Sequence, residues 1–488
     1  MTPDELRTAG FLDPRRALSF FEELPGGAEA WERDLGASAD PDQALLAAIR
    51  LHETDPGLVR GLVDKPDARR RVCAVLGGSQ WLGDYVIADP TRAVAIWEDP
   101  GQSEQVLLAS VGATRAEGGA YVATEGASAD DLRAAYRRVL LYVAADDLTS
   151  EDPGALMPEV GRRIADLVDA TLEAGLALAR RDIDPRGQTP FAIIAMGKTG
   201  ARELNYISDV DVVYVAQAGV DQDERVALEV ATRLAAATAS ACSGPGTEAP
   251  LWTVDANLRP EGRNGALVRT VGSYRQYWDK WAQTWEFQAL LKARACAGDE
   301  VIGRAFEDAA QPYVWSAATR EGFVEAARAM RRRVEDNISR SYASRELKLG
   351  RGGLRDVEFT VQLLQLVHGR TDAFLRVRST LEAIEALRDG GYIARSDADQ
   401  LASCYRFLRA VEHRTQLPRM RRTHLIPDKE RELCVLGRAM DRSRFPDAQS
   451  MSAAIDEVRA RVRALHEDVF YRPIIAATAS LSEDEVSL

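Results

Sequence analysis

The segment from Phe191 to Ala216 constrains the fold of this chain more than any other. Its two ends, Phe191–Met196 and Val210–Val215, are short apolar runs rich in β-branched or aromatic residues, so each is predicted to be a strand. A polar turn separates the two runs. It contains Gly197, Lys198, Gly200 and, just before the second run, Ser208 and Asp209.

The second predicted strand carries two carboxylates, Asp209 and Asp211. Side chains at positions i and i+2 of a strand leave the same face, so both carboxylates point to one spot. Two anions held that close together need a cation between them to stay ionised near neutral pH. Hard oxygen ligands suit Mg²⁺ or Mn²⁺ bound jointly with a phosphate-bearing substrate. The pair therefore indicates phosphoryl or nucleotidyl transfer.

A third carboxylate, Asp255, ends another predicted strand, Leu251–Asp255. Nucleotidyl transfer commonly uses a third acid, so that two metal ions can hold the attacking and the leaving oxygen. An Asp-x-Asp pair alone is a weak signal, but this one follows Gly-Lys-x-Gly and lies between apolar runs. The candidate catalytic residues and metal ligands are therefore Asp209, Asp211 and Asp255. The turn is not a P-loop, because position 192 is Ala where that motif requires Gly.

At 488 residues the chain is too long for one core, and we expect three domains. Residues 1–185 show helical periodicity and are predicted to form an N-terminal helical domain. Residues 186–345 should hold the strands in a catalytic domain, and residues 346–488 should form a C-terminal helical bundle. The strands are too few for a doubly wound sheet. The fold class expected is mainly helical α+β with a small mixed β-sheet, and one of the helices expected after Val271 covers Tyr274–Ala297.

Composition excludes several classes of function. The net charge of −13 argues against a general nucleic-acid binder, which normally carries a basic surplus. No stretch approaches the ~18 uncharged apolar residues of a membrane span. The five cysteines are scattered and lack Cys-x-x-Cys spacing, so they are predicted to be reduced thiols. Because the first residues are acidic and lack an apolar signal core, we expect a cytoplasmic protein.

Four sequence blocks, in this order, resemble one enzyme family. They are Met196–Asp211 (MGKTGARELNYISDVD), Val254–Gly262 (VDANLRPEG), Trp285–Arg294 (WEFQALLKAR) and Lys348–Phe359 (KLGRGGLRDVEF). Together they resemble the bifunctional glutamine synthetase adenylyltransferase/adenylyl-removing enzyme, of the polymerase-β-type nucleotidyltransferase superfamily. The resemblance implies that the strands form a nucleotidyltransferase-fold core.

That family carries two catalytic halves in tandem, and this chain holds one. The motif Glu203-Leu-Asn-Tyr206 resembles the corresponding sequence of the N-terminal, adenylyl-removing half. The resemblance then implies removal of AMP from a tyrosine of adenylylated glutamine synthetase by inorganic phosphate, giving ADP, in the regulation of nitrogen assimilation. Two alternatives stay open: ATP-dependent adenylylation of the same target, and a regulatory module that binds a PII-type signal protein.

Further residues are candidates for binding the phosphate groups. Backbone N–H groups of the turn that starts at Gly197 could contact phosphate oxygens, with Ser208 as an added donor. Lys198 is either a phosphate contact or a solvated turn lysine, and Arg259 either reaches phosphate or pairs with an acid. Lys348 precedes a predicted helix start that is a plausible phosphate seat. Where the family reads VDxRLRP this chain has Asn257, so one arginine contact sometimes found there is missing.

Three other groups have alternative interpretations. Glu286, Lys292 and Arg294 are expected on one helix, where they serve either the site or a structural ion pair. Asp356 and Glu358 are expected to cap or neutralise a helix start more than to bind metal. An aromatic cluster is expected to be core packing, with base stacking as the alternative; it comprises Tyr274, Tyr277, Trp278, Trp281 and Trp285.

Overall fold

A computed structural model describes residues 2–336, 338–339 and 341–471 of the chain. Its N-terminal region is almost entirely helical. The elements there are α1 (Pro3–Ala9), α2 (Pro14–Phe21), α3 (Gly27–Ala37), α4 (Pro41–Thr54), α5 (Pro56–Val63), α6 (Pro66–Gly78), α7 (Gln80–Ala88), the 3₁₀ helix η1 (Pro90–Ile96), α8 (Ser103–Ser110), α9 (Ala129–Thr149) and α10 (Pro153–Ile183). A hairpin of β1 (Thr114–Arg115) and β2 (Tyr121–Val122) interrupts the helices at a Gly-rich turn.

Asp-Pro pairs start several of these helices. Before α2, α4, α5 and α10 an Asp side chain accepts a hydrogen bond from a backbone N–H of the first turn, and Pro follows at the first helical position. The aspartate satisfies a donor that has no partner within the helix, while Pro already has the helical φ and lacks the N–H that would go unpaired. Local sequence therefore determines where these helices begin.

The sheet has five strands: β3 (Phe191–Ala195), β4 (Val210–Ala216), β5 (Val254–Asp255), β6 (Val268–Arg269) and β7 (Arg294–Gly298). The hydrogen-bonded order is β5-β4-β3-β7, with β6 also pairing to β4. β3 is antiparallel to both β4 and β7, whereas β5 and β6 run parallel to β4. The small mixed sheet predicted from the sequence is confirmed.

Strand β7 corrects one expectation. The helix expected over Tyr274–Ala297 does not exist as one element: α13 (Val271–Lys280) and α14 (Thr284–Leu290) are followed by a strand. The segment Arg294–Gly298 contains good helix formers, but it pairs with β3, and tertiary pairing outweighs intrinsic propensity of this size. Lys292 and Arg294 therefore do not lie on the helix that carries Glu286.

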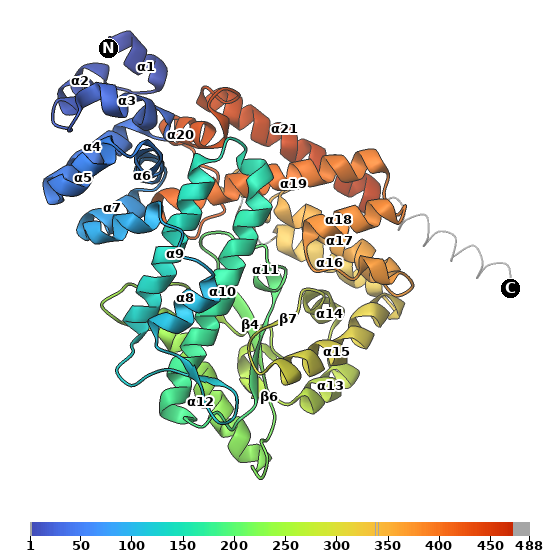
Figure 1. Cartoon of the computed structure of the whole chain (residues 1–488). Helices are drawn as coiled ribbons and strands as arrows, with labels where there is room; N and C mark the ends of the chain where they lie inside the picture. Colours follow the sequence, from blue (N-terminus) through green and yellow to red (C-terminus); the bar gives the residue numbers. More distant parts are fainter. Residues whose placement is uncertain (1, 337, 340, 472–488) are drawn as a thin grey trace.

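The two faces of the sheet belong to different cores because strand side chains alternate. Val210, Val212 and Tyr214 pack into the cluster that also holds the N-terminal helices and α12 (Glu224–Ser243). Val213 and Val215 pack on the opposite face with α13, α14 and α15 (Glu300–Ser316). In Figure 1 the long helices α9 and α10 run beside the sheet on one side, and α13 to α15 lie on the other. The N-terminal helices and the sheet thus share a core, and the predicted domain limits stay a prediction.

The C-terminal region packs around a core of its own. Its helices are α17 (Leu354–His368), α18 (Thr380–Asp389), α19 (Arg395–Gln416), α20 (Glu430–Asp441) and α21 (Ala448–His466). The preceding helix, α16 (Phe323–Asp336), contributes Phe323 to the core that holds α13 to α15. Short helical turns complete the list: α11 (Gly197–Gly200), η2 (Gly262–Asn264), η3 (Ala317–Thr319), η4 (Ala373–Leu375), η5 (Leu417–Arg419) and the π-helical η6 (Glu467–Tyr471). α19 packs across α10 (Figure 1), and its Glu412 contacts Lys198 in the turn between β3 and β4. The mainly helical α+β class is confirmed.

Within the described residues, none of the helices combines the length and the apolar character that crossing a membrane requires. The five cysteines are all unpaired, and three of them are buried.

Candidate functional site

The three predicted aspartates lie at one edge of the sheet. Asp209 directly precedes β4, and Asp211 is its second residue. Asp255 ends β5, which is parallel to β4 in a register that places Asp211 opposite Asp255. Residues opposite each other on paired strands have neighbouring side chains, and Asp209 shares the face of Asp211. Two separate segments, β4 with the residue before it and β5, therefore contribute the three aspartates to this edge of the sheet.

The electrostatics of Asp211 reflect this crowding. Burial and the negative charge of Asp255 raise the pKa of Asp211 to about 6, and Asp209 adds to the shift. Two cations from the C-terminal region, Lys348 and Arg422, oppose it. An acid whose charged form is disfavoured by neighbouring carboxylates gains most from a bound cation.

The donor set fits a divalent metal ion in its chemistry. Carboxylate oxygens are the ligands that Mg²⁺ and Mn²⁺ prefer, and the Asp209 side chain is 27% exposed, so an ion could reach it from solvent. No three acidic, His or Cys side chains are already grouped as ligands among the residues that the structure describes. Asp209 is ion-paired with Arg422. Assignment of the three aspartates as metal ligands stays a prediction.

The glycine turn lies directly over the acidic edge. Gly197 begins α11 with a φ of 53°, in the left-handed region that favours glycine. A Cβ at this position would lie 2.9 Å from a carboxylate oxygen of Asp211. At Gly200 a Cβ would lie 1.9 Å from the carbonyl oxygen of Lys292. Both glycines are therefore required by close approach, and the backbone of the turn lies beside the carboxylates.

Lys198 is largely shielded from solvent, with 10% of its side chain exposed. Its Nζ lies 2.9 and 3.0 Å from the two carboxylate oxygens of Glu412 on α19, and 3.0 Å from Oδ1 of Asn205. Three acceptors match the three donors of an ammonium group. The alternative of a solvated turn lysine is therefore wrong, and a phosphate contact would require Lys198 to leave these partners.

Arg259 supports its own loop. Its guanidinium donates to the backbone carbonyls of Ala256, Arg263 and Gly265 at 2.8 to 3.1 Å. It pairs with no acid among the described residues, so that alternative is not observed, and its predicted phosphate contact remains a prediction. Ser208 makes no hydrogen bond within the described part of the chain, and its hydroxyl, next to Asp209, is free to donate to a ligand.

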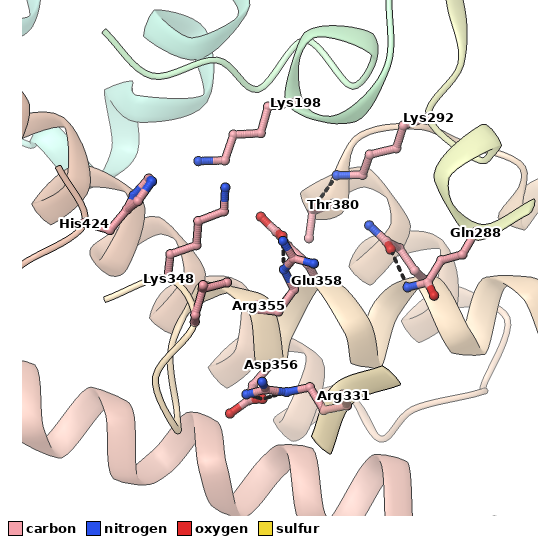
Figure 2. A network of polar contacts seen from close by, with 12 residues as sticks. Lys198, Gln288, Lys292, Arg331, Lys348, Arg355, Asp356, Glu358, Thr380 and His424 are labelled. Carbon is pink, nitrogen blue, oxygen red and sulfur yellow. Dashed lines mark hydrogen bonds and ion pairs between the residues drawn. The ribbon is translucent and has the colours of Figure 1, made fainter. Parts of the chain in front are cut away.

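Lys348 approaches the site from the segment that precedes α17. Its Nζ has no hydrogen bond or ion pair with any described residue. In Figure 2 the side chains of Lys198 and Lys348 extend toward the same space, with Glu358 opposite and His424 to one side. Burial opposes ionisation of Glu358, but the cations Lys292, Lys198, Arg355 and Lys348 outweigh it and lower its pKa. Of these cations, only Lys348 also acts on Asp211 at the acidic edge, where it lowers the pKa of that carboxyl group.

Asp356 has the capping and charge-neutralising role that was expected. It accepts the backbone N–H of Gly352 at 2.7 Å, just before α17, and is ion-paired with the buried Arg331 (Figure 2). The aromatic cluster is only partly core. Tyr274 and Trp278 are buried, whereas Trp281 is 69% exposed.

Two polar residues of the Glu203-Leu-Asn-Tyr206 motif, for which the sequence predicted no contacts, hold the turn in place. Glu203 accepts hydrogen bonds from the backbone N–H of Thr380 at 2.6 Å and from Nζ of Lys292 at 3.1 Å. Asn205 donates to Oε1 of Gln416 at 2.7 Å. The motif Glu203-Leu-Asn-Tyr206 is therefore a set of anchors between the turn, α18 and α19. The one sequence signal for them was the polar content of that motif.

His413, on α19 beneath this turn, makes stability depend on pH. It is buried against the ring of Tyr206, and burial together with the charge of Arg409 lowers its pKa from 6.5 to about 3. The unfolded chain therefore binds a proton that the folded chain excludes, and stability falls as the pH drops below 6.5 toward 3.

We expect His413→Gln to flatten this dependence. Inside that window the slope of unfolding free energy against pH should decrease by up to ~1.4 kcal/mol per pH unit, the value for one proton. Urea unfolding of both proteins at a series of pH values measures it. Above pH 6.5 the two proteins should show the same slope of unfolding free energy against pH. Equal slopes inside the window would mean that His413 does not contribute.

Comparison with known proteins identifies the families and proteins that this chain resembles. A family model described as Glutamate-ammonia ligase adenylyltransferase matches residues 69–309, a range that contains all three aspartates. A second, described as GlnD PII-uridylyltransferase, matches residues 328–470. Similar proteins are named bifunctional glutamine synthetase adenylyltransferase/adenylyl-removing enzyme. The one from Streptomyces coelicolor is 46% identical over 497 aligned positions, covering 98% of this chain and 48% of its own.

The chain is a homologue of one half of these bifunctional enzymes. Their counterparts from Leifsonia xyli and Cutibacterium acnes are 44% and 45% identical, covering 93% and 94% of this chain. The alignments include 46% and 47% of those two proteins, so the chain spans about half the length of the curated relatives it matches. The resemblance inferred from the four sequence blocks is confirmed, and the family is one of nucleotidyltransferases.

Proposed function

We propose that this chain removes AMP from adenylylated glutamine synthetase by phosphorolysis, using inorganic phosphate and releasing ADP. The observation that carries the proposal is the register of β4 and β5, which sets Asp211 opposite Asp255 with Asp209 on the same face. The names of the relatives supply the target, and the Glu203-Leu-Asn-Tyr206 motif favours the removing direction. We also propose a cytoplasmic location, since the cysteines remain free thiols.

The chemistry requires charge neutralisation more than a general base. An oxygen of inorganic phosphate attacks the phosphorus of the tyrosine-bound AMP, the bond from phosphorus to the tyrosine oxygen breaks, and the phenolate takes a proton from solvent. Both reactants are anionic, so fixed positive groups and oriented dipoles lower the barrier. A phenol has a pKa near ~10, so its oxygen is a fair leaving group without a strong acid.

Each part of the site has a place in this reaction. Asp209, Asp211 and Asp255 would hold Mg²⁺ or Mn²⁺, which when bound supplies charge stabilisation at the attacking and leaving oxygens. The backbone of the Gly197 turn and the hydroxyl of Ser208 orient phosphate oxygens. Lys348 supplies a positive charge without a competing acidic partner among the described residues. The buried contacts of Glu203 and Asn205 keep the turn rigid while the substrate binds.

The direction of the reaction is the open choice within the family. ATP-dependent adenylylation would use the same three carboxylates, so it is the rival activity. A PII-type signal protein is a candidate partner for the C-terminal helices, because the family model matched by residues 328–470 is named for a PII-modifying enzyme.

We expect adenylylated glutamine synthetase, incubated with the chain, Mg²⁺ and inorganic phosphate, to lose AMP and yield an equal amount of ADP. Mass spectrometry of the target and chromatography of the nucleotide measure both products. Omission of phosphate is the control and should stop the reaction. Transfer of labelled AMP from ATP to unmodified target, without any phosphate-dependent release, would instead establish the rival activity.

A further inference from the structure

Arg422 is the one arginine that contacts the predicted metal ligands within the described residues. It lies on the segment between η5 and α20, and its guanidinium is ion-paired with Asp209 although 54% of the side chain is exposed. In sequence the two residues are 213 positions apart. An exposed ion pair of this kind is worth at most ~1 kcal/mol, so the contact is easily exchanged for another.

The backbone that carries Arg422 is firmly held. Met420 adopts a φ of 43°, which turns the chain sharply. The carbonyl of Thr423 accepts from Nε2 of Gln416 at 3.3 Å, and the carbonyl of His424 accepts from the backbone N–H of Leu347 at 2.8 Å. Arg422 is therefore presented at a defined place from which only its side chain needs to move.

The same contacts bring Arg422 and Lys348 to one site. Leu347 precedes Lys348, and an antiparallel bridge joins Glu346 to Leu425, so the two cations stand on hydrogen-bonded neighbouring segments. Both act on the charge of Asp211. Lys348 has no acidic partner in the described part of the chain. Arg422 is paired with Asp209, which is also a predicted metal ligand.

We propose that Arg422, together with Lys348, binds the inorganic phosphate that attacks the adenylyl group, and that its guanidinium alternates between Asp209 and this phosphate. This inference rests on the proposed phosphorolysis. A planar guanidinium matches two phosphate oxygens at once, which an ammonium group does not. With Asp209 engaged by a divalent cation, the guanidinium turns to the incoming anion. Arg422 thus neutralises the charge of Asp209 while no metal ion is bound, and it binds the attacking phosphate once a divalent cation has taken its place at Asp209.

The neighbouring arginine offers a matched control. Arg421 is also exposed and lacks a hydrogen bond or ion pair among the described residues, but it lines a separate cavity with Arg414 and Arg431 on the side of the N-terminal helices. Arg421→Gln and Arg422→Gln remove the same charge from the same segment. Because both side chains are exposed, both variants should unfold at the temperature of the parent chain.

The test is equilibrium titration of the whole chain with Mn²⁺ alone, and then with inorganic phosphate in the presence of Mn²⁺. Arg422→Gln should bind Mn²⁺ about two- to fivefold more tightly, because the competing ion pair is gone. Its affinity for phosphate should fall by a factor of about 10 or more, the effect of losing a charged hydrogen bond. Arg422→Lys should recover only part of the phosphate affinity, because lysine keeps the positive charge but lacks the planar guanidinium that contacts two phosphate oxygens at once.

Arg421→Gln should leave both affinities unchanged. Equal phosphate affinities in the two Gln variants would overturn the inference, and so would full recovery of binding by Arg422→Lys. These titrations do not depend on turnover. If the parent chain releases ADP from the adenylylated target while Arg422→Gln binds phosphate normally, the phosphorolysis proposal stands and the role of Arg422 fails.

Discussion

Replacing Asp211 by asparagine should reduce the rate of phosphate-dependent AMP release by ~10³-fold or more, the loss expected when several kcal/mol of metal-based stabilisation disappear. Asparagine keeps the shape of the side chain and removes the charge that faces Asp255. Because this also relieves the repulsion that raises the pKa of Asp211, the metal-free variant should melt no lower than the parent chain. Turnover assays and thermal unfolding of the same preparations measure the two effects.

Asp389→Asn is the control for this variant. Asp389 ends α18 and is 67% exposed in its ion pair with Arg388, so its loss should change neither rate nor melting temperature. Near-normal activity of Asp211→Asn would contradict the site itself. The non-catalytic alternative, a regulatory module, would then become the better account of the chain.

Replacing Asp147 by alanine should lower the free energy of unfolding by ~3–5 kcal/mol, the usual cost of leaving one partner of a buried ion pair. Asp147 of α9 accepts hydrogen bonds from Nη1 and Nη2 of Arg414 at 2.5 and 2.8 Å, and from the hydroxyl of Tyr206 at 2.8 Å. Both charged side chains are 2% exposed. The substitution leaves the nearly buried Arg414 guanidinium without its carboxylate partner.

The contrast is with an exposed pair of the same chemistry. Arg304 and Glu300 pair at 3.0 Å but are 76% and 81% exposed, so Arg304→Ala should cost less than ~1 kcal/mol. Urea unfolding followed by tryptophan fluorescence measures both variants. Similar losses from the two substitutions would mean that the Asp147 cluster does not join the N-terminal helices to α19. Asp147→Ala should also slow catalysis, because Tyr206 lies in the turn that leads to Asp209.

Local patterns predicted much of the fold. The strands β3 and β4 follow from short, continuous apolar runs, and the shared face of Asp209 and Asp211 follows from strand alternation; both depend on neighbours only a few residues away. The helix start that the sequence predicts after Lys348 is the start of α17 at Leu354. Its start is marked by the glycines that precede it and by Asp356, all within one helical turn. Signals of this kind can be recognised in a sequence because strand alternation and helix capping involve residues that are close in the chain.

Other elements depended on partners far along the chain. β7 was expected to be helix, because its residues favour helix and only pairing with β3 makes it a strand. Lys198 could not be assigned from its turn, since Glu412 holds it from 214 positions away. Arg422 gave no signal for the same reason.

The order of residues alone thus indicated the family, one of nucleotidyltransferases, and predicted three aspartates on extended segments beside a glycine turn as its site. Only the folded chain decided which cations face those aspartates and which are consumed by buried partners. The physical reason is range. Strand alternation and helix capping act between near neighbours, whereas the charges that balance a carboxylate are chosen by packing of segments hundreds of residues apart.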